Sequence, residues 1–110
     1  MNDDGAWIEV ESREGCLIVC LRGEIDLSNV DSVEQRIEGE LVGFPHIVID
    51  LSEIEYIDSQ GLRLLNQLSK RLAREGSTLQ LIAPPGSFTR GILDLTLISE
   101  DIEVLDAAPG

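Results

Sequence analysis

The sequence contains few aromatic, basic and cysteine residues. Aromatic residues make up 4% of the 110 residues, so a packed core has to be built from leucine, isoleucine and valine. Only 8 lysines and arginines stand against 21 acidic residues, and the net charge is -13. Nucleic-acid affinity comes largely from basic side chains that displace counterions. This charge balance therefore argues against direct nucleic-acid binding and favours a basic protein partner.

Long apolar runs, metal-ligand sets and closely spaced cysteines are also missing. No run approaches the roughly 20 apolar residues of a membrane span, and Met1–Gly5 is acidic, so we expect a cytoplasmic protein with no membrane span. Cys16 and Cys20 lie on one face of a predicted strand, and a separation of about 13 Å prevents a disulfide. We expect both thiols to be reduced and packed in the core. With His46 as the single histidine, we expect no metal site.

Strand and helix patterns alternate along the chain. The order strand, strand, helix, strand, helix, strand, helix, strand predicts an α/β fold with a mixed, largely parallel sheet and an N-terminal hairpin. One domain should span residues 1–110, with a loose tail at 107–110. The expected strands are 7–11, 16–21, 46–51, 78–83 and 102–105, and the expected helices are 29–41, one from near Ser59 to before Gly76, and 87–97. The expected buried stripes are Leu62, Leu65, Leu68 and Leu72 in the second helix, and Phe88, Ile92 and Leu95 in the third.

Three loops should meet at one edge of this sheet. They are residues 23–28, 52–59 and 84–87, and each follows a strand. Open α/β sheets place their sites at this edge. The second loop leads into the second helix, whose first amides need an N-cap residue. We favour Ser59 as this N-cap, and Asp58 is an equally good cap that would leave Ser59 free. Gly61 weakens a helix interior, so we expect something to approach its backbone closely.

The run Asp58 to Leu62, which reads Asp-Ser-Gln-Gly-Leu, has a strand before it and the segment Gly23 to Asp26 further upstream. In this context it resembles the STAS domains of bacterial anti-sigma factor antagonists, over about residues 7–105. The resemblance implies that Ser59 is phosphorylated by an anti-sigma factor that is also an ATP-dependent serine kinase. It implies that the unmodified protein binds that kinase and that a PP2C-type phosphatase restores it. It also implies that this chain needs no cofactor, because the nucleotide and the magnesium belong to the kinase. The implied partner-binding residues are Asp26, Glu24, Ser28, Asp58, Gln60 and Gly61.

Other functions fit the residues less well. Members of the same family also act as non-switching scaffolds or partner subunits of stress-signalling or lipid-transport complexes. A receiver-like domain would use Asp50 as the phosphoacceptor, but it needs an acidic cluster after the first strand and a lysine near the last. A hydrolase would need a base near Ser59, and His46 should lie at the opposite edge of the sheet. We therefore expect a binding protein and not an enzyme.

Overall fold

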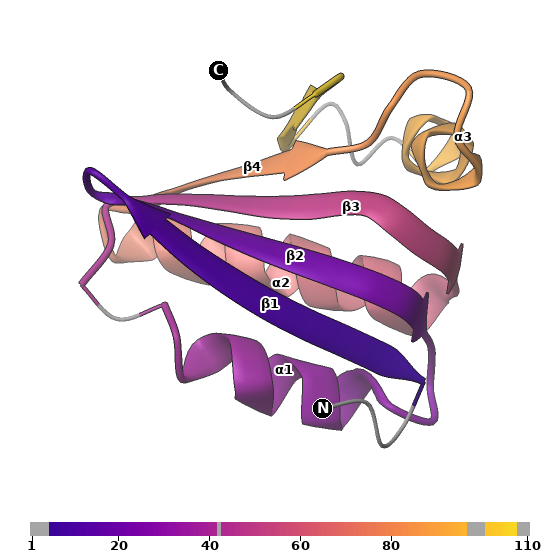
Figure 1. The fold of residues 1–110 in the computed structure, drawn as a ribbon, viewed down its shortest axis with the longest axis horizontal. Coiled ribbons are helices and arrows are strands. Elements are labelled where there is room, and N and C mark those ends of the chain that lie inside the picture. Colours follow the sequence, from indigo (N-terminus) through magenta and orange to yellow (C-terminus); the bar gives the residue numbers. More distant parts are fainter. Residues whose placement is uncertain (1–4, 42, 97–100, 108–110) are drawn as a thin grey trace.

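A five-stranded sheet with three helices forms the described part of the chain (Figure 1). The computed structural model describes residues 5–41, 43–96 and 101–107. The elements follow the predicted order: β1 (Ala6–Arg13), β2 (Cys16–Ile25), α1 (Val30–Glu38), β3 (His46–Ile57), α2 (Ser59–Arg74), β4 (Thr78–Ile82), α3 (Phe88–Leu95) and β5 (Glu103–Leu105). The strands lie in the order β1-β2-β3-β4-β5, with β1 antiparallel to β2 and the other pairs parallel. The predicted hairpin and largely parallel sheet are confirmed.

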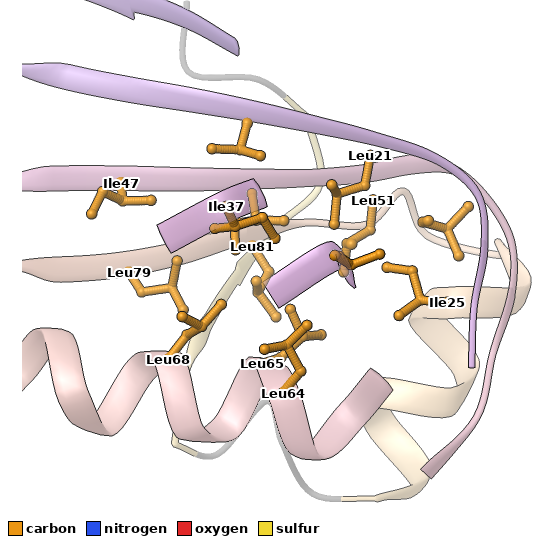
Figure 2. Packing of buried hydrophobic residues seen from close by; sticks show 14 of the residues in the cluster. Leu21, Ile25, Ile37, Ile47, Leu51, Leu64, Leu65, Leu68, Leu79 and Leu81 are labelled. Carbon is orange, nitrogen blue, oxygen red and sulfur yellow. The ribbon is translucent and has the colours of Figure 1, made fainter. Parts of the chain in front are cut away.

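The main core lies between the sheet and the helices α1 and α2. Alternate residues of β2 and β3 are buried towards these helices, and α3 lies apart from them beside β3 (Figure 1). Figure 2 shows Leu65 and Leu68 of α2 pointing towards Ile47 and Leu81 of the sheet. Burial of such a side chain contributes about 1.5 to 3 kcal/mol, so the aliphatic core expected from the composition supplies most of the driving force.

The buried stripe of α2 differs by one position from the prediction. Leu65, Leu68 and Leu72 are buried as predicted, but Leu62 is only half-buried and Leu64 takes its place in the core. α1 is shorter than predicted at both ends. Its N-cap residue is Asn29, and its buried residues are Val33 and Ile37.

The strand β3 is twice as long as predicted, so most of the expected loop over residues 52–59 is strand instead. It continues to Ile57 because β2 also continues beyond Gly23, and the two strands stay paired through two register shifts. Gly23 does not end a strand. Its φ is +90°, and a Cβ there would lie 2.2 Å from the carbonyl oxygen of Gly5. This glycine therefore permits an irregular ladder, which carries both strands to the edge where the site lies.

The predicted buried face of α3 is wrong at two of its three residues, because only Ile92 packs against the core. Phe88 and Leu95 are 53% and 81% exposed, whereas Thr89 and Leu93 are buried. The Ser87 side chain accepts a hydrogen bond from the Arg90 amide, which caps the helix start. Apolar residues occur on both faces of α3, so their spacing alone did not decide which face is buried. The predicted end of this helix at residue 97, and most of the predicted tail at 107–110, lie outside the described residues.

Trp7 and both cysteines lie in the hairpin formed by β1 and β2. Both Cys16 and Cys20 are free thiols, as predicted, but they are half-buried and lie outside the main core cluster. Burial raises the pKa of the Cys20 thiol, with a further increase from the nearby Asp50 carboxylate. Trp7 lies in the hairpin, 37% exposed, and its Nε1 donates to Glu9 at 3.0 Å.

Candidate functional site

The candidate site lies where β2 and β3 end and α1 and α2 begin, at the right of Figure 1. The amide of Asp58 donates to the carbonyl oxygen of Ile25 at 3.2 Å, which continues the β2–β3 pairing into the turn. The Asp58 Oδ2 atom accepts a hydrogen bond from the amide of Leu27 at 3.0 Å. These two contacts fix the turn before α2 against the turn before α1.

Asp58 is the N-cap of α2. Its Oδ1 atom accepts hydrogen bonds from the amides of Gln60 at 2.9 Å and Gly61 at 3.2 Å. The favoured prediction that Ser59 caps this helix is therefore wrong, and the alternative with Asp58 is confirmed. An aspartate has two carboxylate oxygens, so it satisfies the helix amides with one and holds the neighbouring turn with the other.

Ser59 is the first residue of α2, and its side chain is exposed. Among the residues that the structure describes, none forms a hydrogen bond with its hydroxyl group. The backbone of this residue is held firmly because its neighbours carry the cap and the sheet contacts. The hydroxyl is thus presented to the outside from a rigid position.

The turn before α1 is built around Asp26 and Asn29. The Asp26 Oδ1 atom accepts from the Ser28 amide at 2.9 Å and from its hydroxyl at 2.5 Å. Asn29 is only 2% exposed, and its side chain accepts from the Asp26 amide at 3.0 Å and donates to the Glu24 carbonyl at 2.8 Å. Asn29 was not among the predicted site residues. Buried polar side chains are nearly always hydrogen-bonded, so its structural role can be recognised only when its burial is known.

The predicted partner-binding residues differ in how accessible they are. Glu24 and Ser28 are exposed, Asp26, Asp58 and Gln60 are half-buried, and Gly61 is buried.

The close approach expected at Gly61 comes from the chain itself. A Cβ on this residue would lie 2.5 Å from Cγ1 of Ile57 and 3.1 Å from Cγ2 of Ile25. Gly61 therefore lets the first turn of α2 pack directly on the ends of β2 and β3.

Three apolar side chains are exposed at this edge, and of these only Phe88 had a sequence-based prediction, which placed it in the core. Leu27 is 73% exposed, Tyr56 45% and Phe88 53%. The rings of Tyr56 and Phe88 stack with their centroids 6.5 Å apart. Glu24 is the β2 partner of Tyr56 in the sheet register, so a carboxylate lies beside this aromatic pair. The edge combines acidic and apolar groups, a composition that suits binding to a protein surface.

The positions of Asp50 and His46 do not favour a receiver-like domain or a serine hydrolase. Asp50 lies inside β3, where its Oδ1 accepts from the amide of Ser52 at 2.9 Å and from its hydroxyl. His46 begins β3 and contacts the hydroxyl of Thr78, so it lies at the opposite end of that strand from Ser59. In residues 5–41, 43–96 and 101–107 there is no group of three or more histidine, cysteine, aspartate or glutamate residues that could hold a metal. Within the same residues no helix is long and apolar enough to cross a membrane.

Comparison with known proteins identifies the family of this chain. The family model of the STAS domain matches residues 8–106. This chain belongs to the STAS domain family. The anti-sigma-F factor antagonist RsfB of Mycobacterium tuberculosis is 32% identical to it over 90 residues, which cover 79% of this chain and 70% of that protein. Osmosensory protein A of the same species is 31% identical over 81 residues, or 74% of this chain. This STAS chain spans only 51% of the length of osmosensory protein A.

A solved structure shows the same fold. The crystal structure of an anti-sigma factor antagonist from Mycobacterium paratuberculosis superposes on this STAS domain with a TM-score of 0.83 and 27% sequence identity. The match covers 96% of this chain and 90% of that one. The fold expected from the sequence is therefore confirmed, and this chain's relatives include anti-sigma factor antagonists.

Proposed function

We propose that this STAS domain is an anti-sigma factor antagonist whose binding is switched by phosphorylation of Ser59. In this proposal the unmodified protein binds an anti-sigma factor that is also a serine kinase, and so frees a sigma factor for transcription. Phosphorylation of Ser59 releases the complex, and a PP2C-type phosphatase removes the phosphate. The proteins named as anti-sigma factor antagonists among its relatives support this assignment.

The observation that carries the proposal is the exposed hydroxyl of Ser59. A kinase has to bring the γ-phosphorus of ATP into line with the attacking oxygen, so the hydroxyl must be reachable and well positioned. Asp58 makes this possible by taking over the helix cap, which leaves the Ser59 hydroxyl unused.

The phosphoryl transfer uses chemistry that the kinase supplies. A bond forms between Ser59 Oγ and the γ-phosphorus, and the bond from that phosphorus to the bridging oxygen of ATP breaks. ADP leaves with the electron pair, and the hydroxyl proton passes to a base of the kinase. We therefore propose that this chain is the substrate and binding partner, that it is not an enzyme and needs no cofactor, and that it acts in the cytoplasm.

The charge change explains release. A phosphate adds a charge of about -1.5 to -2 at pH 7. It would arrive at an edge that already carries Glu24, Asp26 and Asp58, in a chain of net charge -13. A partner whose surface accommodates these carboxylates next to a neutral serine would then face a larger charge and a bulkier group. The phosphate needs no core rearrangement because the hydroxyl already points outward.

The test is phosphorylation by purified anti-sigma factor kinases of the source organism. Each kinase is incubated with the full chain and ATP, and the product is analysed by mass spectrometry with peptide mapping. We expect a single added phosphate on Ser59 with at least one of these kinases. The matched control is Ser12→Ala, which removes an exposed hydroxyl from β1 near the start of β2, at the opposite end of the sheet from the site, and should leave phosphorylation intact. Phosphate on another residue, or none with any of the kinases, would reject the switch and leave a non-switching STAS scaffold.

A further inference from the structure

Arg63 lies one helical turn after Ser59 on the surface of α2. The two residues are four positions apart, and side chains at this spacing are neighbours on a helix. Both are exposed. Helical side chains lean towards the N-terminus, so the long Arg63 side chain is able to reach in the direction of Ser59.

The Arg63 guanidinium is available for a new partner. Arg13, Arg22, Arg71 and Arg90 each form an ion pair with a carboxylate. Arg63, in contrast, makes no ion pair with any residue that the structure describes.

Two acidic side chains of α1 share a groove with Arg63. Asp31 and Glu34 line a groove of about 240 Å³ together with Gln60, Arg63 and Gln67. Neither carboxylate forms an ion pair with Arg63 within the described ranges of the chain. They keep the groove acidic, so a phosphate beside it would meet repulsion unless a cation intervenes.

Arg63 is also the only lysine or arginine in the first two turns of α2. A phosphate on Ser59 would lie near the carboxylates of Asp26 and Asp58. Guanidinium groups bind phosphates through two parallel hydrogen bonds and remain charged at every physiological pH. Among the residues of this helix start, Arg63 alone can neutralise the new charge.

We infer that Arg63 binds the phosphoryl group of phosphorylated Ser59 and holds it against the first turn of α2. The inference rests on the proposed function, because it describes the phosphorylated state of that site. Arg63 is then a positioning residue: it takes no part in the transfer, and it sets the charge and orientation that the kinase and the phosphatase meet.

The test uses protein in which phosphoserine is incorporated at position 59 during synthesis, so no kinase is needed. A ³¹P NMR titration then follows the second ionisation of the phosphate in the parent and in Arg63→Gln. Loss of a paired cation favours the monoanion, so we expect the pKa of the phosphate to rise by about 0.4 unit or more in this variant. The titratable side chains around the site are the carboxylates of Glu24, Asp26, Asp31, Glu34 and Asp58, which every variant retains.

The matched control is Arg74→Gln, which removes the same charge from an exposed position in the last turn of α2. At 1.5 Å per residue this position lies about 22 Å along the helix from Ser59, beyond the reach of a direct contact with the phosphate. We expect the control to titrate like the parent. Arg63→Lys, which keeps the charge but loses the planar fork, should fall between the parent and Arg63→Gln.

Equal titration curves for the parent and Arg63→Gln would overturn the inference, and so would equal shifts in Arg63→Gln and Arg74→Gln. Neither result bears on whether a kinase phosphorylates Ser59. Conversely, failure of every kinase to modify Ser59 would reject the proposed switch and leave this measurement unchanged. The contact between Arg63 and the phosphate and the phosphorylation switch at Ser59 can therefore each be disproved without the other.

Discussion

Replacing Asp58 with alanine should destabilise the protein by about 2 kcal/mol. Loss of an N-cap side chain costs about 1 kcal/mol, because the amides of Gln60 and Gly61 lose their acceptor. Loss of the hydrogen bond from the Leu27 amide to Oδ2 costs about 1 kcal/mol more. For a domain of this size, the sum lowers the melting temperature by about 5 to 10 °C.

Two further variants separate the contributions. Asp58→Asn keeps one oxygen for the cap but presents an NH₂ group to the Leu27 amide, so it should cost only about 1 kcal/mol. Ser59→Ala removes a hydroxyl that no described residue uses, so its stability should stay within about 0.5 kcal/mol of the parent.

The assay is urea unfolding followed by circular dichroism, with melting temperatures as a second measure. The expected order of stability is Ser59→Ala close to the parent, then Asp58→Asn, then Asp58→Ala. If Ser59→Ala lost as much stability as Asp58→Ala, the hydroxyl would be part of the cap and the assignment of the two residues would be refuted. An unchanged Asp58→Ala variant would show that the turn is held by other contacts.

Three other perturbations test the surroundings of the site. Gly61→Ala should destabilise the protein by about 1 to 3 kcal/mol in urea unfolding, because the new methyl would lie 2.5 Å from the Ile57 side chain. Gly91→Ala in α3 has open space around it and should stabilise the protein by up to about 1 kcal/mol. Equal effects would disprove the packing argument. Burial and the charge of Asp50 raise the pKa of the Cys20 thiol, so less thiolate is present at a given pH. The pH midpoint of Cys20 alkylation should therefore lie above that of free cysteine, and it should fall in Asp50→Asn. An unshifted midpoint in that variant would show that Asp50 has no influence on the thiol. Asn29→Ala should cost about 1 to 3 kcal/mol by thermal unfolding, since buried polar partners lose their hydrogen bonds; a neutral result would mean that water replaces the side chain.

The order of elements could be predicted because local signals carry it. The β-branched run that begins β3 and the leucine spacing of α2 are typical of a buried strand and a half-buried helix, and both elements form. The location of the site followed from the same order, since parallel strands place their ends at one edge of the sheet. The position of Ser59 at the start of α2 needed no long-range information.

The features that were missed depend on contacts between distant parts of the chain. The extension of β3 to Ile57 requires β2 to continue beside it, and this pairing includes a register shift at Gly23. The local sequence pattern predicted a strand end at Gly23 instead. The exposure of Phe88 depends on which face of α3 meets β3 and on its contact with Tyr56. Whether Asp58 or Ser59 caps α2 could not be decided because both side chains are good caps.

The most direct test of the switch compares two forms of the full chain in one binding experiment. The unmodified protein and the protein carrying phosphoserine at position 59 are titrated into the anti-sigma factor kinase that modifies Ser59, by isothermal calorimetry without ATP. The account predicts that the unmodified form binds and that phosphorylation weakens binding at least about 100-fold, which corresponds to about 2.7 kcal/mol. Equal affinity of the two forms would contradict the claim that charge at Ser59 decides whether the partner stays bound.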